Sequence, residues 1–159
     1  MTKARRRHAI RLTTVVVLVG LFSSCAPAST GPTATQSDQE ETTMTTVTDA
    51  VAASDPRVAD VLTVKVTESG MARVMSIAVS ISGDEPVSTE TVVNIAVAAL
   101  QNAKSDIDDL KILARSAADT DVILDLSPAG EGLPADVEWV WLSSSLQLIG
   151  ADLSELSAG

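Results

Sequence analysis

The sequence predicts a small α+β domain, a two-layer α/β sandwich in the order β-β-α-β-β with a further C-terminal hairpin or helix. Residues 57–82 contain two runs in which apolar and polar side chains alternate, which is typical of half-buried strands. A helix signal follows at Ser88, and two β-rich runs come after it. Aromatic residues make up only 2% of the chain against 45% hydrophobic residues, so the core is expected to consist of Val, Ile, Leu and Ala.

The first two strands are expected to form a β-hairpin. Leu62, Val64 and Val66 alternate with polar residues, and residues 71–82 alternate in the same way. Gly70 lies between the two runs and supplies a turn signal.

The next element is expected to be a helix that begins after Ser88 and ends near Lys104. Ser88 is a good N-cap, and Glu90 lies in the first turn, where the helix dipole favours an anion. The apolar residues that follow recur at helical spacing, and several are alanines, which allow close contact with a sheet.

Two further strands are expected at residues 108–116 and 120–127. Residues 137–149 fit two interpretations. Alternation through Trp139 and Trp141 favours a hairpin, whereas the leucines from 142 onward also fit a helical face. The three serines at 143–145 are poor helix formers, so we favour strands.

The N-terminal residues have the pattern of an export signal. Five of the eleven basic residues lie in the first eleven positions, and residues 12–22 form an uncharged apolar run. This run is about half the roughly 20 residues that a membrane-spanning helix needs. A basic head followed by a short apolar segment and small residues is typical of a secretory signal peptide.

The end of that segment, Phe22-Ser23-Ser24-Cys25, contains the single cysteine of the chain. It resembles the lipobox of bacterial lipoproteins, in which an aliphatic residue and two small residues precede an invariant cysteine. Phe22 departs from the usual leucine at the first position. The resemblance to the lipobox covers about the first 25 residues. In its Ala-, Val-, Asp- and Thr-rich composition, the whole chain also resembles small uncharacterised lipoproteins of high-GC Gram-positive bacteria.

The resemblance implies that Cys25 receives a diacylglyceryl group and that a peptidase cleaves between Ser24 and Cys25. Two acyl chains hold a protein stably on a membrane. The expected organisation is therefore a signal peptide at 1–24, a lipidated cysteine with a disordered tether at 25–56, and the α/β domain at 57–159. The tether is expected because residues 26–56 are rich in Thr, Ser, Ala and Pro. The protein is then expected at the extracytoplasmic face of the cell membrane, with the alternative that the apolar segment stays as an uncleaved anchor.

Composition and motifs exclude several kinds of activity. All 21 acidic residues lie at Asp38 or later, and this acidic body disfavours nucleic acid. The only His, His8, lies in the signal segment, and no further Cys follows Cys25. Catalysis by His or Cys and zinc binding through His or Cys ligands are therefore excluded. Gly130 and Gly132 are interpreted as loop residues and not as a phosphate cradle. We therefore assign no catalytic residue, cofactor, metal ligand or small-molecule ligand, and expect a protein that is not an enzyme.

Carboxylates and tryptophans remain as candidates. Two aspartate clusters offer oxygen ligands of the type that calcium prefers, but neither has the spacing of a calcium-binding loop. We expect a non-catalytic binding or assembly domain whose partner is an envelope protein. Trp139 and Trp141 form the candidate interaction patch; the alternative is that their rings cover the core. A carboxylate-based hydrolase and a calcium-responsive domain are the alternatives. The clusters are Asp106, Asp108 and Asp109, and Asp119, Asp121 and Asp125.

Overall fold

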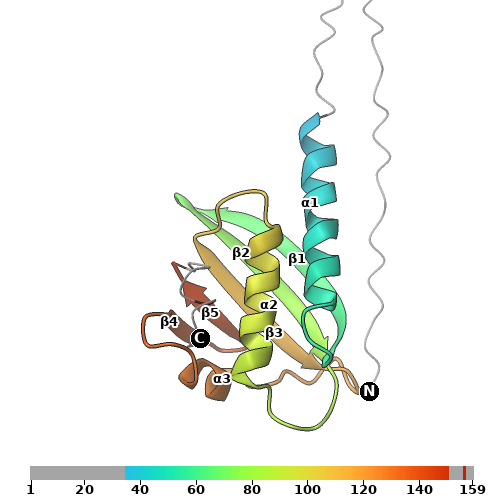
Figure 1. Cartoon of the computed structure of the whole chain (residues 1–159), viewed down its shortest axis with the longest axis vertical. Helices are drawn as coiled ribbons and strands as arrows, with labels where there is room; N and C mark the ends of the chain where they lie inside the picture. Colours follow the sequence, from blue (N-terminus) through green and yellow to red (C-terminus); the bar gives the residue numbers. More distant parts are fainter. Residues whose placement is uncertain (1–34, 151–155, 157–159) are drawn as a thin grey trace, which may run out of the picture. The chain divides into compact units, whose positions relative to one another are not determined.

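A computed structural model describes residues 35–150 and residue 156, with side chains from residue 41 onward. This part of the chain forms a five-stranded mixed sheet and three helices (Figure 1), which confirms the predicted α+β class. The elements are α1 (Thr35–Ala52), β1 (Val58–Ser69), β2 (Ala72–Ile81), α2 (Thr89–Asn102), β3 (Asp109–Ser116), α3 (Ser127–Glu131), β4 (Glu138–Leu142) and β5 (Ser145–Ile149).

The strand order in the sheet is β1-β2-β3-β5-β4. β2 and β3 are parallel, and every other neighbouring pair is antiparallel. The predicted hairpin of β1 and β2 is confirmed, and Gly70 takes a φ of +67° in its turn, a conformation that glycine adopts without steric cost. Parallel strands need a crossover connection, and α2 provides it between β2 and β3.

The start of α2 is held by the residue that the sequence predicts as its cap. The Oγ atom of Ser88 accepts a hydrogen bond from the backbone N–H of Thr91 at 3.1 Å. This satisfies one of the N–H groups that have no partner inside the first helical turn. The helix ends at Asn102, two residues before the predicted end.

The predicted disordered tether at residues 25–56 is wrong for residues 35–52, which form α1. Val47 and Val51 are completely buried, and α1 packs against both β1 and α2. The spacing of four residues places both valines on one face of the helix. Packing of this valine stripe stabilises a helix whose polar composition alone does not predict it, so the folded domain begins before residue 57.

The predicted strand at residues 120–127 is also wrong. Within the described chain this segment makes one isolated bridge, between Arg115 and Ile123, and is otherwise a loop. Its aspartates bind the backbone instead: the carboxylate of Asp119 accepts from the N–H of Asp121 at 3.0 Å. Such local bonds compete with strand pairing, which explains the difference.

The predicted C-terminal hairpin is confirmed as β4 and β5, so the helical alternative for residues 137–149 does not apply. Ser143 lies in the turn with a φ of +53°. After residue 150 the structure describes residue 156 alone. Leu156, which is described, is buried.

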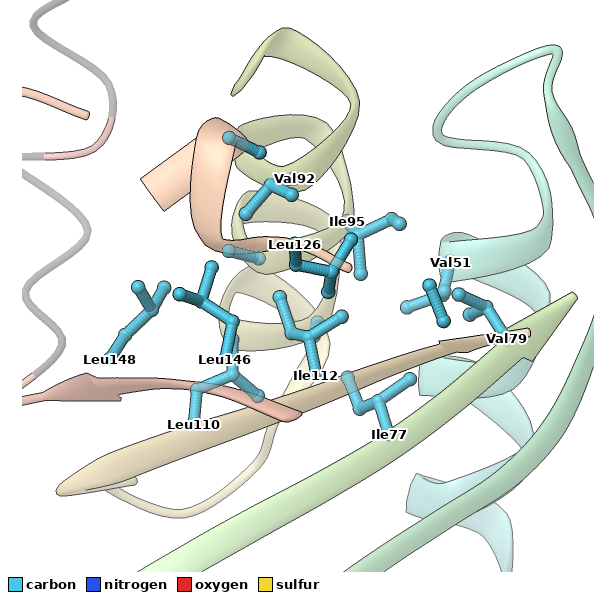
Figure 2. Packing of buried hydrophobic residues seen from close by; sticks show 14 of the residues in the cluster. Val51, Ile77, Val79, Val92, Ile95, Leu110, Ile112, Leu126, Leu146 and Leu148 are labelled. Atoms are coloured by element: carbon cyan, nitrogen blue, oxygen red, sulfur yellow. The ribbon is translucent and has the colours of Figure 1, made fainter. Parts of the chain in front are cut away.

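The core lies between the sheet and the helices. Figure 2 shows Ile77, Ile112 and Leu146 directed from the sheet towards the side of the molecule where α1 and α2 lie. Val51, Val92, Ile95 and Leu126 meet them from that side. The helices therefore cover one face of the sheet, as the view in Figure 1 also shows.

Candidate binding surface

The second face of the sheet carries the residues that alternate with the core residues. The strand register aligns Lys65, Ser76 and Lys111 in one row that continues to Gln147 and Val140. Directly paired residues point to the same side of a sheet. We call this side the open face; it consists of Asp60, Thr63, Lys65, Thr67, Val74, Ser76, Ala78, Ser80, Asp109, Lys111, Leu113, Arg115, Glu138, Val140, Leu142, Ser145, Gln147 and Ile149.

Large aliphatic side chains are exposed on the half of the open face formed by β3, β5 and β4. Val140, Leu142 and Ile149 are 36%, 42% and 37% exposed. Ile123 is 43% exposed, and its bridge with Arg115 places it on the same face, beside the half-buried Leu113. Grouped apolar side chains on a surface mark an interaction site more often than scattered ones do.

The open face also differs in charge from the rest of the domain. It carries three carboxylates (Asp60, Asp109, Glu138) and three cations (Lys65, Lys111, Arg115). Elsewhere between residues 41 and 150 there are fourteen acidic residues and three basic ones. The open face is thus close to neutral, while the remaining surface is strongly acidic.

Two lysines of the open face have no polar partner among the described residues. Neither Lys65 nor Lys111 makes a hydrogen bond or ion pair there, and the ion pair of this part of the chain joins Arg73 to Glu68 at 3.9 Å. Asp109, next to Lys111, is engaged: it accepts from Gln147 Nε2 at 3.0 Å and from the N–H of Gly150 at 3.3 Å. The two ammonium groups are therefore free to meet a partner.

Trp139 and Trp141 lie on the opposite face of β4 from Val140 and Leu142. Both are half-buried and pack against the hydrophobic core. The Trp139 ring lies against Gly130 in α3, where an added Cβ would come within 2.7 Å of ring atom Cε3. The two rings thus cover the edge of the core, and an interaction patch at their exposed parts stays a prediction.

Four of the six aspartates singled out from the sequence, Asp108, Asp109, Asp119 and Asp125, accept hydrogen bonds. Asp108 accepts from the N–H of Arg73 at 2.6 Å, and Asp125 accepts from the backbone and hydroxyl of Ser127 at 2.8 and 2.7 Å. These bonds from Ser127, the hydroxyl first, lower the pKa of Asp125. Within residues 41–150 and residue 156, no three acidic, His or Cys side chains are placed to hold a metal ion together.

A hollow of about 360 Å³ lies at the tip of the β1–β2 hairpin. Met71, which is fully exposed, and the Arg73–Glu68 pair line it together with Asp106 and Asp108. Its walls are polar and open to solvent, unlike the mostly apolar and enclosed pockets that bind small molecules.

Gly130 and Gly132 belong to α3 and its C-terminal end and make close contacts with neighbouring elements. A Cβ at Gly132 would collide with Thr89, whose hydroxyl donates to the carbonyl of Ala129 at 2.8 Å. These glycines therefore serve packing between α3, α2 and β4.

Cys25, the cleavage position at Ser24 and the whole predicted signal segment lie outside the described residues. Among the described helices, none is long and apolar enough to cross a bilayer. Comparison with protein-family models, curated proteins and solved structures finds no match for this chain.

The open face was not among the sites predicted from the sequence, although one signal for it is present. Residues 139–142 are all apolar, so β4 does not alternate between apolar and polar side chains as a half-buried strand does. Val140 and Leu142 are the residues that break the alternation. Their exposure results from the position of the helices on the opposite face of the sheet.

Proposed function

We propose that this protein is a lipid-anchored, non-catalytic binding module of the cell envelope. Cys25 holds it at the extracytoplasmic face of the membrane, and the open face binds a protein partner there. The anchor is supported by the basic N-terminal residues, the short apolar run and the lipobox-like Phe22-Ser23-Ser24-Cys25.

The observation that carries the binding role is the one-sided covering of the sheet. Val140, Leu142 and Ile149 stay exposed on a face that no described helix covers, beside Lys111, which has no polar partner within the described part of the chain. A group of exposed apolar side chains bordered by polar and charged ones is typical of protein interfaces, which have an apolar core and a polar rim.

The anchor is tested by fractionating cells that express the full chain or its Cys25→Ala variant. The full chain is expected in the membrane fraction, with a mass that includes the acyl chains on the peptide beginning at Cys25. The variant is expected to lose the lipid and to keep Ser24 joined to residue 25. A variant that is processed and retained like the unsubstituted chain would contradict the proposal.

The calcium-responsive alternative has a separate test. Thermal unfolding of the anchored protein is compared with calcium and with a chelator, and the binding module is expected to unfold at the same temperature in both. A calcium-dependent rise in the unfolding temperature would favour the cation-responsive alternative.

A further inference from the structure

We propose that the open face is the interface of a homodimer, in which the β3–β5–β4 half of the face packs against the same half of a second copy. This inference rests on the proposed function, because the membrane anchor concentrates the copies, and it names the partner as another molecule of this chain.

Charge is the first argument for a second copy. Two copies that met through most other parts of the described surface would bring carboxylates together, since acidic residues there outnumber basic ones by fourteen to three. On the open face the two signs are balanced. A surface with both signs can be complementary to itself, because each cation of one copy can meet a carboxylate of the other.

The aliphatic residues are the second argument. Leu113, Val140, Leu142 and Ile149 come from three neighbouring strands, β3, β4 and β5, and Ile123 extends the same group. Packing two such faces removes apolar area from water on both copies, as in the two-sheet core of a β-sandwich.

The strand order predicts which residues meet. β5 lies between β3 and β4, so a twofold axis along β5 places β3 of one copy over β4 of the other. Leu142 then faces Leu113 of the second copy. Glu138 faces Asp109 of the second copy, and Lys111 of that copy lies one row away along the strands, within reach of both carboxylates. The interface thus has Leu113–Leu142 contacts in one row and, on each side, Lys111 and Asp109 of one copy near Glu138 of the other.

Three short strands form a contact at the low end of the sizes found for protein interfaces. Association in dilute solution is therefore expected to be weak. Anchoring on a membrane raises the effective concentration of the copies, and this strengthens pairing without any new contact.

The test is cross-linking in isolated membranes with the full-length chain. Ser145 begins β5 on the open face and so lies near the expected axis, and Ser145→Cys introduces a thiol there. The lipid occupies the Cys25 thiol in the anchored protein, so the unsubstituted chain is the first control. Thr46→Cys, exposed on α1 away from the sheet, is the matched control for an engineered thiol. With a short bismaleimide, Ser145→Cys is expected to yield a species of twice the protomer mass and Thr46→Cys is not.

Charge reversal then tests the contact between Lys111 and Glu138. Lys111→Glu in the Ser145→Cys chain is expected to lower the cross-linked fraction by about tenfold, since it places a third carboxylate near Asp109 and Glu138 on each side of the interface. Adding Glu138→Lys to give the double variant returns a lysine to this cluster and is expected to restore cross-linking. Lys104→Glu, an exposed charge reversal outside the open face, is expected to leave it unchanged.

Each failure has a separate meaning. Equal cross-linking of Thr46→Cys, a product containing a different protein, or no recovery in the double variant would overturn the homodimer. Fractionation in the same preparation reports the anchor independently: a soluble chain with a free Cys25 would overturn the proposed function, and the unsubstituted control would detect that thiol.

Discussion

The indole of Trp139 lies so close to Gly130 that no side chain fits between them: a Cβ on Gly130 would come within 2.7 to 2.9 Å of three ring carbons. This contact joins α3 to β4 on the core side of the sheet, directly behind Val140 and Leu142 of the open face. The support of the open face therefore depends on a glycine in a helix of five residues.

Gly130→Ala is expected to lower the free energy of unfolding by about 1–3 kcal/mol, because overpacking shifts the ring or the helix. Urea denaturation followed by tryptophan fluorescence measures both the stability and the ring environment. Gly70→Ala is the comparison, since nothing lies within 4 Å of its added Cβ and its cost arises from a φ of +67°. An unchanged emission spectrum and stability in Gly130→Ala would contradict the contact.

Val47→Ala is expected to lower the free energy of unfolding by about 1–3 kcal/mol, as large-to-small substitutions in a core do. The side chain is completely buried where α1 packs on the sheet. Thr46→Ala, at the next and exposed position, is expected to change stability by less than about 0.5 kcal/mol. Equal effects of the two substitutions in chemical denaturation would show that α1 does not pack there and that the tether extends further.

Ser143→Gly is expected to stabilise the protein by roughly 0.5–1 kcal/mol, since residues with a side chain are strained at positive φ and glycine is not. Ser143 has a φ of +53° in the β4–β5 turn. Ser144→Gly, in the same turn but without positive φ, is expected to give no gain. Thermal unfolding of the two variants distinguishes them, and a destabilised Ser143→Gly would contradict the turn geometry.

Ser127→Ala is expected to raise the pKa of Asp125 towards its ordinary value of 3.8, because the hydroxyl bond is the largest cause of its lowering. The backbone N–H of Ser127 still donates, so part of the lowering is expected to remain. A lowered folded-state pKa contributes stability above the ordinary value, and that contribution is lost as the pH falls through the folded value. Carboxyl NMR titration measures the shift; Ser127→Thr, which keeps the hydroxyl, is the control.

Much of the sheet and its crossover helix could be predicted from local patterns. The alternation in residues 62–67 and 75–81, the turn at Gly70 and the cap at Ser88 each act within a few residues of the chain. The serine turn between β4 and β5 is a local signal of the same kind. These elements could therefore be predicted from residues that lie close together in the sequence.

The remaining elements depend on contacts between distant residues. α1 is rich in threonine, and the hydroxyls of three threonines donate to carbonyls four residues earlier, at Glu41, Thr42 and Met44. Its stability comes from placing Val47 and Val51 against the sheet, which local composition does not reveal. The loop at 117–125 contains consecutive aliphatic residues at 122–124, which are typical of a strand. Asp119 and Asp125, however, accept hydrogen bonds from neighbouring backbone N–H groups.

The open face could not be recognised from the sequence for a related reason. The order β1-β2-β3-β5-β4 inserts the last strand between β3 and β4, and this brings Leu113, Leu142 and Ile149 together. The face emerges from pairings that span tens of residues. The sequence shows which strand residues are apolar, but not which side the helices leave uncovered.

The central claim is that the open face is covered by protein when the chain is on its membrane. Hydroxyl-radical labelling of the unsubstituted chain in membranes, read by mass spectrometry and normalised to the unfolded protein, tests it most directly. Val122 is 47% exposed and lies outside the open face, so it is an internal reference for the 36–42% exposed Val140, Leu142 and Ile149. We expect these three residues to be labelled several-fold less than Val122. Labelling in proportion to their exposure would contradict the account.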